Sequence, residues 1–235
     1  MTTHTENLQG LITRARYVLF DFDGPICRLF AGHSAREVTR VLVGWLEARG
    51  LRDLLTDEER WSTDPWDVLR AVDSRHPRPG AAVAALEERL TQEELKAAAC
   101  ATPTPYADPL LRTWAARGVP LAVTTNNSPR AARQYLRDRG LEGAFGPHVY
   151  GRSRDLNLLK PDPHCLDQAL RAFGASPGDA LMIGDAPTDL MAARSAGVGF
   201  LGYVRNERKE KILRDAGAGY LVPTLQDVLS VLSAG

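Results

Sequence analysis

The sequence predicts an α/β protein in which a parallel sheet carries helices on both faces and a helical domain is inserted after the first strand. Two observations support this prediction. From about residue 110, helical and strand patterns alternate along the chain, as is typical of a parallel sheet. The region before it is helical in pattern and ends at a Pro-rich segment. We expect the sheet domain to comprise residues 1–29 and 106–235 and the insert to comprise residues 30–105.

The first predicted strand is the run YVLFDFDG at residues 17–24, which is β-branched and aromatic. It breaks at Gly24 and Pro25, so a turn should follow. The insert then shows apolar residues at helical spacing, with Ser34 placed to cap the first helix. Its predicted helices cover residues 34–50, 62–76 and 79–100. The segment ATPTPYADP, residues 101–109, cannot continue a helix and marks the boundary.

The remainder of the chain alternates strictly between helix and strand. Residues 110–118, 128–140, 164–174 and 188–197 are predicted helices, and residues 120–125, 146–152, 180–185 and 199–204 are predicted strands. A last helix, strand and helix complete the chain. Such alternation indicates a parallel sheet with helices on both faces.

Composition narrows the classes of partner. Lys plus Arg number 29 and Asp plus Glu number 29, so the net charge is near zero. The chain therefore has no overall positive potential to attract nucleic acid or an anionic membrane. The three cysteines, Cys27, Cys100 and Cys165, are too widely spaced for a zinc site and are expected to be reduced thiols. No signal peptide or membrane-spanning run is recognisable. We therefore expect a soluble cytoplasmic protein, either monomeric or homodimeric.

Polar residues follow several of the predicted strands. In an open parallel sheet, ligands bind beyond the carboxyl ends of the strands. Asp21 and Asp23 end the first strand, and Asp185 and Asp189 follow the strand at 180–185. Thr125 and Asn126 end the strand at 120–125, and Lys160 precedes the helix at 164–174. These residues are the candidates for the functional site.

These segments, in this order, resemble the four motifs of the haloacid dehalogenase superfamily. The resemblance covers nearly the whole chain and is to the phosphatase branch with a helical cap, which includes phosphoglycolate phosphatases. Motif one appears as Asp21-Phe22-Asp23-Gly24, motif two as Thr125 with Asn126, motif three as Lys160-Pro161, and motif four as Gly184-Asp185 with Asp189. The resemblance implies a Rossmann-like core, residues 1–29 and 106–235, with a cap at 30–105. Each motif alone is weak, since Asp-x-Asp is frequent by chance and Asp185 and Asp189 are also ordinary helix-capping residues. All four in order, each at the end of the expected kind of element, are a strong signal.

The resemblance implies a Mg²⁺-dependent phosphatase that acts on a small phosphorylated metabolite. In the family pattern Asp21 attacks phosphorus to give an aspartyl phosphate, and Asp23 protonates the leaving group. Lys160, the Thr125 hydroxyl and the backbone amide of Asn126 bind the phosphoryl oxygens.

The metal ligands in the family pattern are carboxylate and carbonyl oxygens, which Mg²⁺ prefers. They would be the Asp21 carboxylate, the Asp23 carbonyl and the Asp185 carboxylate, with Asp189 nearby or acting through water. His33 and Arg28 follow motif one in the sequence. Both are candidates for substrate contact, and the alternative for each is a solvated or structural role.

One position departs from the family pattern, because Pro25 stands where a Thr or β-branched residue is usual. Proline has no hydroxyl and no amide hydrogen, so any hydrogen bond from that position is lost. Two other functions stay open at this point. A phosphomutase of the β-phosphoglucomutase type has the same four motifs, and a non-catalytic protein with this fold could bind a phosphorylated metabolite. Protein phosphatase activity is disfavoured, because a cap suits a substrate small enough to enclose.

Overall fold

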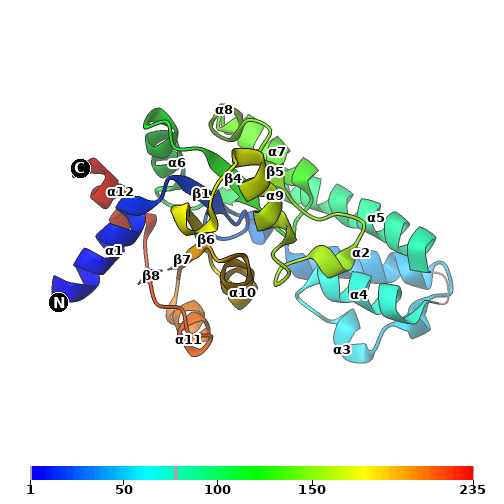
Figure 1. The fold of residues 1–235 in the computed structure, drawn as a ribbon. Helices are drawn as coiled ribbons and strands as arrows, with labels where there is room; N and C mark the ends of the chain where they lie inside the picture. The colour runs from blue at the N-terminus through cyan, green and yellow to red at the C-terminus, as the bar shows by residue number, and fades with distance from the viewer. Residues whose placement is uncertain (1, 77–78, 235) are drawn as a thin grey trace. The chain divides into compact units, whose positions relative to one another are not determined.

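The computed structural model describes residues 2–76 and 79–234. The chain divides into two compact units (Figure 1). One comprises Met1–Arg28 and Pro103–Gly235, and the other comprises Leu29–Thr102. The division falls close to the boundaries expected from the sequence, while the roles of the two units as core and cap stay a prediction.

The larger unit contains a parallel sheet, which confirms the predicted fold class. Within the described residues the sheet has six strands in the order β5-β4-β1-β6-β7-β8, and each neighbouring pair is parallel. The strands are β1 (Tyr17–Phe20), β4 (Leu121–Thr124), β5 (Val149–Tyr150), β6 (Ala180–Gly184), β7 (Gly199–Tyr203) and β8 (Leu221–Val222). A separate pair is formed by β2 (Cys27–Arg28) and β3 (Thr102–Pro103).

The order of the strands reverses at β1. The chain runs from β1 to β4 and β5 on one side, then returns to β6 on the other side of β1 and continues to β7 and β8. Such a reversal opens a crevice beyond the carboxyl ends of the central strands, where ligands bind in sheets of this kind. The topology therefore directs attention to the residues that follow β1, β4 and β6.

Helices cover both faces of the sheet, and the alternating side chains of β1 show how. Leu19 is fully buried in an apolar cluster with residues of α9 (His164–Phe173), α10 (Pro187–Ala196) and α11 (Glu207–Asp215). Phe20 points the other way and meets Trp114 of α6 (Ala107–Ala116) edge to face, with ring centroids 5.7 Å apart. Because successive strand residues face opposite sides, one short strand packs against both helical layers. The helices α7 (Pro129–Asp138) and α8 (Glu142–Phe145) follow β4 along the chain.

The chain begins with a helix that the sequence analysis does not predict. Helix α1 (Thr2–Arg14) contacts α12 (Leu225–Ser233), and α12 in turn contacts α6. Figure 1 shows α1 and α12 lying side by side. Ile12 is 1% exposed, and Leu8 and Leu11 are partly buried, so the apolar residues of the second half of the helix hold it against the body of the unit.

The smaller unit is helical, and its described helices are α2 (Ala35–Glu47), α3 (Asp57–Arg60), α4 (Pro65–Arg75) and α5 (Pro79–Ala99). As the sequence predicts, Ser34 caps α2: its hydroxyl accepts from Glu37 N at 3.2 Å, and the Glu37 carboxylate accepts from Ser34 N at 2.9 Å. This reciprocal capping satisfies two backbone donors. Short 3-10 turns cover Leu29–Ala31, Arg52–Leu54, Leu156–Leu158 and Pro177–Asp179. No helix in the described residues is long and apolar enough to span a bilayer.

Candidate active site

Three neighbouring strands deliver candidate residues to the same edge of the sheet. Asp21 follows β1, Thr125 follows β4, and Asp185 follows β6. Backbone pairing continues past the strands, since Asp21 N donates to Ile183 O at 2.9 Å and Thr125 N donates to Tyr150 O at 3.0 Å. The backbone at these positions is therefore fixed by the sheet itself.

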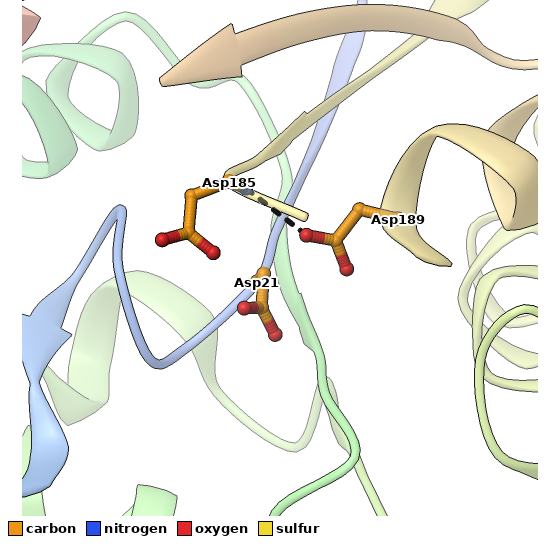
Figure 2. Close-up of side chains that lie close together, drawn as sticks. All are labelled: Asp21, Asp185 and Asp189. Atoms are coloured by element: carbon orange, nitrogen blue, oxygen red, sulfur yellow. Dashed lines mark hydrogen bonds between the residues drawn. The ribbon is translucent and has the colours of Figure 1, made fainter. Parts of the chain in front are cut away.

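Three carboxylates converge at this edge. Figure 2 shows Asp21, Asp185 and Asp189 lying close together, from the ends of β1 and β6 and from the first turn of α10. Each offers an oxygen such that all three oxygens lie within 4.8 Å of one another. Asp21 is 8% exposed, Asp185 6% and Asp189 1%. Buried carboxylates this close repel one another, so the cluster requires compensating positive charge.

The start of α10 supplies part of that compensation. Asp189 Oδ2 accepts from the backbone N–H groups of Asp185 and Ala186, both at 3.0 Å. The unpaired N–H groups at a helix N-terminus bind an anion well. Asp189 thus closes the turn that presents Asp185.

A glycine permits the close approach of the motif-one loop to Asp185. Gly24 has a φ of 133°, in a region that side-chain-bearing residues rarely adopt, and a Cβ there would lie 2.5 Å from Asp185 Cγ. Glycine is therefore required both for its conformation and for its lack of volume. The loop is closed by hydrogen bonds from Gly24 N to Cys27 O at 2.7 Å and from Cys27 N to Phe22 O at 3.1 Å. Pro25 lies within this closed turn.

Lys160 lies between two of the three carboxylates. Its Nζ donates to Asp21 Oδ1 at 2.8 Å, to Asp189 Oδ1 at 2.6 Å and to the Thr124 carbonyl at 2.9 Å. The residue is 5% exposed. All three ammonium protons have an acceptor, so the lysine is held in one position by its bonds.

Asn126 fixes the backbone that carries this lysine. Its Nδ2 donates to Lys160 O at 3.0 Å, and its Oδ1 accepts from Lys160 N at 2.7 Å. A side-chain amide thereby pairs with the main chain of a residue far along the sequence, much as one strand pairs with another. The expected role of the Asn126 backbone amide in binding phosphoryl oxygens stays a prediction.

Burial and charge shift the acidity of these groups. Desolvation, together with Asp189 and Asp185, raises the pKa of Asp21 to about 7, although Lys160 acts in the opposite direction. Desolvation also raises the pKa of Asp185 above its ordinary value. The two carboxylates beside Lys160 more than offset its desolvation and raise its pKa, so the ammonium stays protonated.

The donor set suits a hard divalent cation. Both oxygens of Asp189 are already hydrogen-bonded, as is Asp21 Oδ1. Asp21 Oδ2 and Asp185 Oδ1 receive no hydrogen bond from any residue that the structure describes. Two such carboxylate oxygens, with water completing the coordination, are typical of magnesium sites. The cluster can therefore hold a metal ion through Asp21 and Asp185, with Asp189 in a supporting position.

The hydroxyl of Thr125 lies in a tight turn after β4. Thr125 Oγ1 donates to Asn127 Oδ1 at 3.0 Å and accepts from Asn127 N at 3.1 Å. Arg152, which is 5% exposed, braces the same turn: its Nη1 donates to Asn126 O at 3.1 Å and its N to Asn127 O at 2.9 Å. Arg152 is a positioning residue that sequence analysis missed.

The other candidates fall outside the carboxylate cluster. Asp23 contributes no side-chain oxygen to it in the described structure, and its expected backbone contact with the metal stays a prediction. Arg28 is exposed at the end of β2. His33 belongs to the helical unit, where its Nε2 lies 2.8 Å from Oε2 of the buried Glu93. The predicted substrate contacts of Arg28 and His33 are proposals.

Lys209 is a further charged residue that the sequence analysis did not single out. Its Nζ lies 2.9 Å from Asp185 Oδ2 and donates to the Asp185 carbonyl at 3.0 Å. It lies in the first turn of α11, which follows β7. The signal available in the sequence was its place just after the strand next to β6, but no motif marks it.

Comparison with known proteins identifies the family. The family model described as haloacid dehalogenase-like hydrolase matches residues 15–197. The chain belongs to this family. The match includes Asp21, Thr125, Lys160, Asp185 and Asp189, and so agrees with the resemblance drawn from the four motifs.

Curated relatives of this haloacid dehalogenase-like hydrolase match over shorter segments. Phosphoglycolate phosphatase of Rhodospirillum rubrum is 42% identical over 94 residues, which cover 40% of this chain and 38% of that protein. Phosphoserine phosphatase of Thermus thermophilus is 39% identical over 95 residues, which cover 40% of this chain and 37% of that protein. The matches thus span well under two thirds of the length of these relatives.

Solved structures resemble the chain over nearly its full length. A predicted phosphoglycolate phosphatase from Haemophilus somnus 129pt has a TM-score of 0.67 and 19% identity, covering 93% of this chain and 98% of that one. CbbY from Rhodobacter sphaeroides, in complex with xylulose-(1,5)bisphosphate, has a TM-score of 0.63 and 21% identity, covering 89% of this chain and 94% of that one. At such identities the likeness shows a shared fold.

Proposed function

We propose that this hydrolase is a Mg²⁺-dependent phosphatase that acts on a small phosphorylated metabolite through an aspartyl phosphate on Asp21. The observation that best supports the proposal is the arrangement around Asp21. One of its oxygens is held by Lys160 at 2.8 Å, and its carboxylate belongs to a cluster that suits a divalent cation. A carboxylate held in this way has a defined direction in which to attack phosphorus.

The reaction would proceed in two displacements. One oxygen of the Asp21 carboxylate forms a bond to phosphorus while the other stays available to the metal; the bond to the leaving oxygen breaks, and Asp23 gives that oxygen a proton. Water then attacks phosphorus of the aspartyl phosphate, Asp23 accepts a proton from it, and Asp21 is released with inorganic phosphate. Mg²⁺ held by Asp21 and Asp185, with Asp189 nearby, would supply positive charge that neutralises the phosphoryl oxygens.

The remaining groups of the site would bind the phosphoryl group. Lys160 carries a permanent positive charge next to Asp21, and the Thr125 hydroxyl and Asn126 amide lie at the end of the neighbouring strand. The Lys160 charge is held in place before substrate binds, so it needs little reorganisation when charge develops on the phosphoryl oxygens. The Thr125 hydroxyl would exchange its bond to Asn127 for one to the phosphoryl group. Arg152 and the Asn126 side chain keep that strand end and Lys160 in register.

The relatives support a small substrate. Two of them are named for phosphoglycolate and phosphoserine, both small phosphate monoesters that also carry a carboxylate. We propose that residues 30–105 act as the cap that recognises the leaving group, with His33 and Arg28 as candidate contacts.

The three cysteines are free thiols, which supports a reducing, cytoplasmic location. The chain is proposed to act as a monomer or homodimer.

The test is release of inorganic phosphate from 2-phosphoglycolate, phosphoserine, pyrophosphate, sugar phosphates and nucleotides, with Mg²⁺ and with a chelator. We expect metal-dependent release that Asp21→Asn lowers by at least about 10³-fold, because the nucleophile is lost. Asp215→Asn is the matched control, since the Asp215 side chain is 65% exposed and pairs with Lys211 on α11. Turnover by Asp21→Asn at the wild-type rate would refute the proposed mechanism.

The same panel separates the alternatives. Conversion of a sugar phosphate to its isomer without phosphate release would identify a mutase. Tight binding of one compound with neither reaction, at saturating Mg²⁺, would indicate a binding protein. Either outcome would replace the phosphatase proposal.

A further inference from the structure

Lys209 places a second ammonium group in the carboxylate cluster. It contacts Asp185 twice, at Oδ2 at 2.9 Å and at the main-chain carbonyl at 3.0 Å. Its side chain is 26% exposed and that of Asp185 is 8% exposed. An ion pair this buried is screened far less than one on the surface.

The position of Lys209 in its helix is otherwise unfavourable. Asn206 caps α11 by accepting a hydrogen bond from Lys209 N at 2.9 Å, which puts Lys209 in the first turn. The positive end of the helix dipole lies there and favours acidic residues, such as Glu207 and Glu210 in the same turn. The contact with Asp185 is therefore the interaction that offsets the unfavourable position of Lys209.

The two lysines divide the carboxylates between them. Lys160 pairs with Asp21 and Asp189, and Lys209 pairs with Asp185. Three carboxylates against two ammonium groups leave one net negative charge. A divalent cation would reverse that sign and give the site one net positive charge, which suits an anionic substrate.

We propose that Lys209 competes with the divalent cation for Asp185 and so limits the metal affinity of the site. This inference rests on the proposed metal site. A carboxylate with one oxygen paired to an ammonium presents less negative potential at its other oxygen, and two cations on one carboxylate repel each other. Lys209 thus lowers the affinity of the site for the metal and adds positive charge that attracts the substrate.

The test measures Mg²⁺ affinity by titration calorimetry on the full chain. Lys209→Met should bind Mg²⁺ about tenfold more tightly than the wild type, since it removes the competing charge. Its thermal midpoint without divalent cations should fall, because Asp185 loses its partner, and Mg²⁺ should raise that midpoint by more than in the wild type. Lys209→Gln keeps a hydrogen-bond donor without the charge, and its Mg²⁺ affinity should also rise. This variant replaces Lys209→Met in the test if the methionine variant folds poorly.

Two controls separate contact from general charge. Lys211→Met removes a lysine from the same helix, where it pairs with the exposed Asp215, and should bind Mg²⁺ as the wild type does. Arg205→Met removes a positive charge that acts on Asp185 without a hydrogen bond or ion pair between them in the described structure. Its effect on Mg²⁺ affinity should be less than about threefold.

Three outcomes would overturn the inference. Unchanged affinity in Lys209→Met would show that the two cations do not compete. Weaker affinity would show that Lys209 orients Asp185 for the metal instead. An equal gain in Mg²⁺ affinity in Arg205→Met would show that the effect comes from the general electrostatic field and not from the contact of Lys209 with Asp185. If the wild type binds Mg²⁺ but releases no phosphate from any compound, the proposed function fails while the affinity comparison still decides the role of Lys209.

Discussion

Replacing Lys160 with methionine removes a cation that two buried carboxylates share. The ammonium lies 2.8 Å from Asp21 and 2.6 Å from Asp189, and the lysine side chain is 2% exposed. Methionine keeps most of the length of the side chain but leaves both acids without this partner. Removing one member of a buried ion pair destabilises a protein by about 3–5 kcal/mol. For a chain of this size that corresponds to a fall of roughly 6–20 °C in the thermal midpoint.

The assay is thermal unfolding at pH 8 in the presence of a chelator. Lys211→Met is the control, because its pair with Asp215 is exposed and should contribute less than about 1 kcal/mol. A midpoint for Lys160→Met as close to the wild type as that of the control would refute the reasoning. It would mean that the carboxylates are compensated in some other way.

A second signature comes from pH. In the variant the pKa of Asp21 should rise further above its value of about 7, because the cation that opposes the rise is gone. Protonation then neutralises Asp21 at low pH, and the repulsion between the acids weakens. The thermal midpoint of Lys160→Met should therefore lie closer to that of the wild type at pH 5.5 than at pH 8.

Two further predictions concern the acids and the glycine beside them. Without divalent cations, the pKa of Asp21 is raised from 3.8 to about 7 on folding, so the folded chain binds more protons between these values. Its contribution to stability is present below pH 3.8 and is lost as the pH rises toward 7. Asp21→Asn should show a shallower fall in thermal midpoint over this range, and equal slopes would contradict the assignment. Gly24→Ala should weaken Mg²⁺ binding by at least about tenfold, since a Cβ would meet Asp185 Cγ at 2.5 Å. Gly118→Ala, also at positive φ but with nothing within 4 Å, should bind Mg²⁺ normally in calorimetry.

The sequence was sufficient to predict the fold and the residues that end the strands. Asp21, Thr125 and Asp185 each follow an apolar run, and parallel strands bring their carboxyl ends to one edge whatever the lengths of the connections. Local pattern and one topological rule therefore place these residues together. The alternation of helix and strand specified the rest of the sheet.

Other features depend on side-chain directions that no local pattern encodes. Lys209 is one of several basic residues in a polar helix, and only the contact of its Nζ with Asp185 distinguishes it. The side chain of Asn126 pairs with the Lys160 backbone, whereas the motif drew attention to the backbone N–H of Asn126. Helix α1 was missed because its composition is polar, and its burial of Ile12 arises from tertiary contact.

The pairing of Asn126 with Lys160 also bears on how the chain tolerates change. It joins two positions 34 residues apart, so the placement of the lysine is set by the end of β4 and not by the path of the segment between them. Shortening or lengthening the exposed turn around Gly146 should leave the lysine where it is. That exposed turn is thus free to vary in length, whereas β5 and Arg152 in the same segment are held against the turn after β4. Asn126 must be kept, because its side chain bonds the backbone of Lys160.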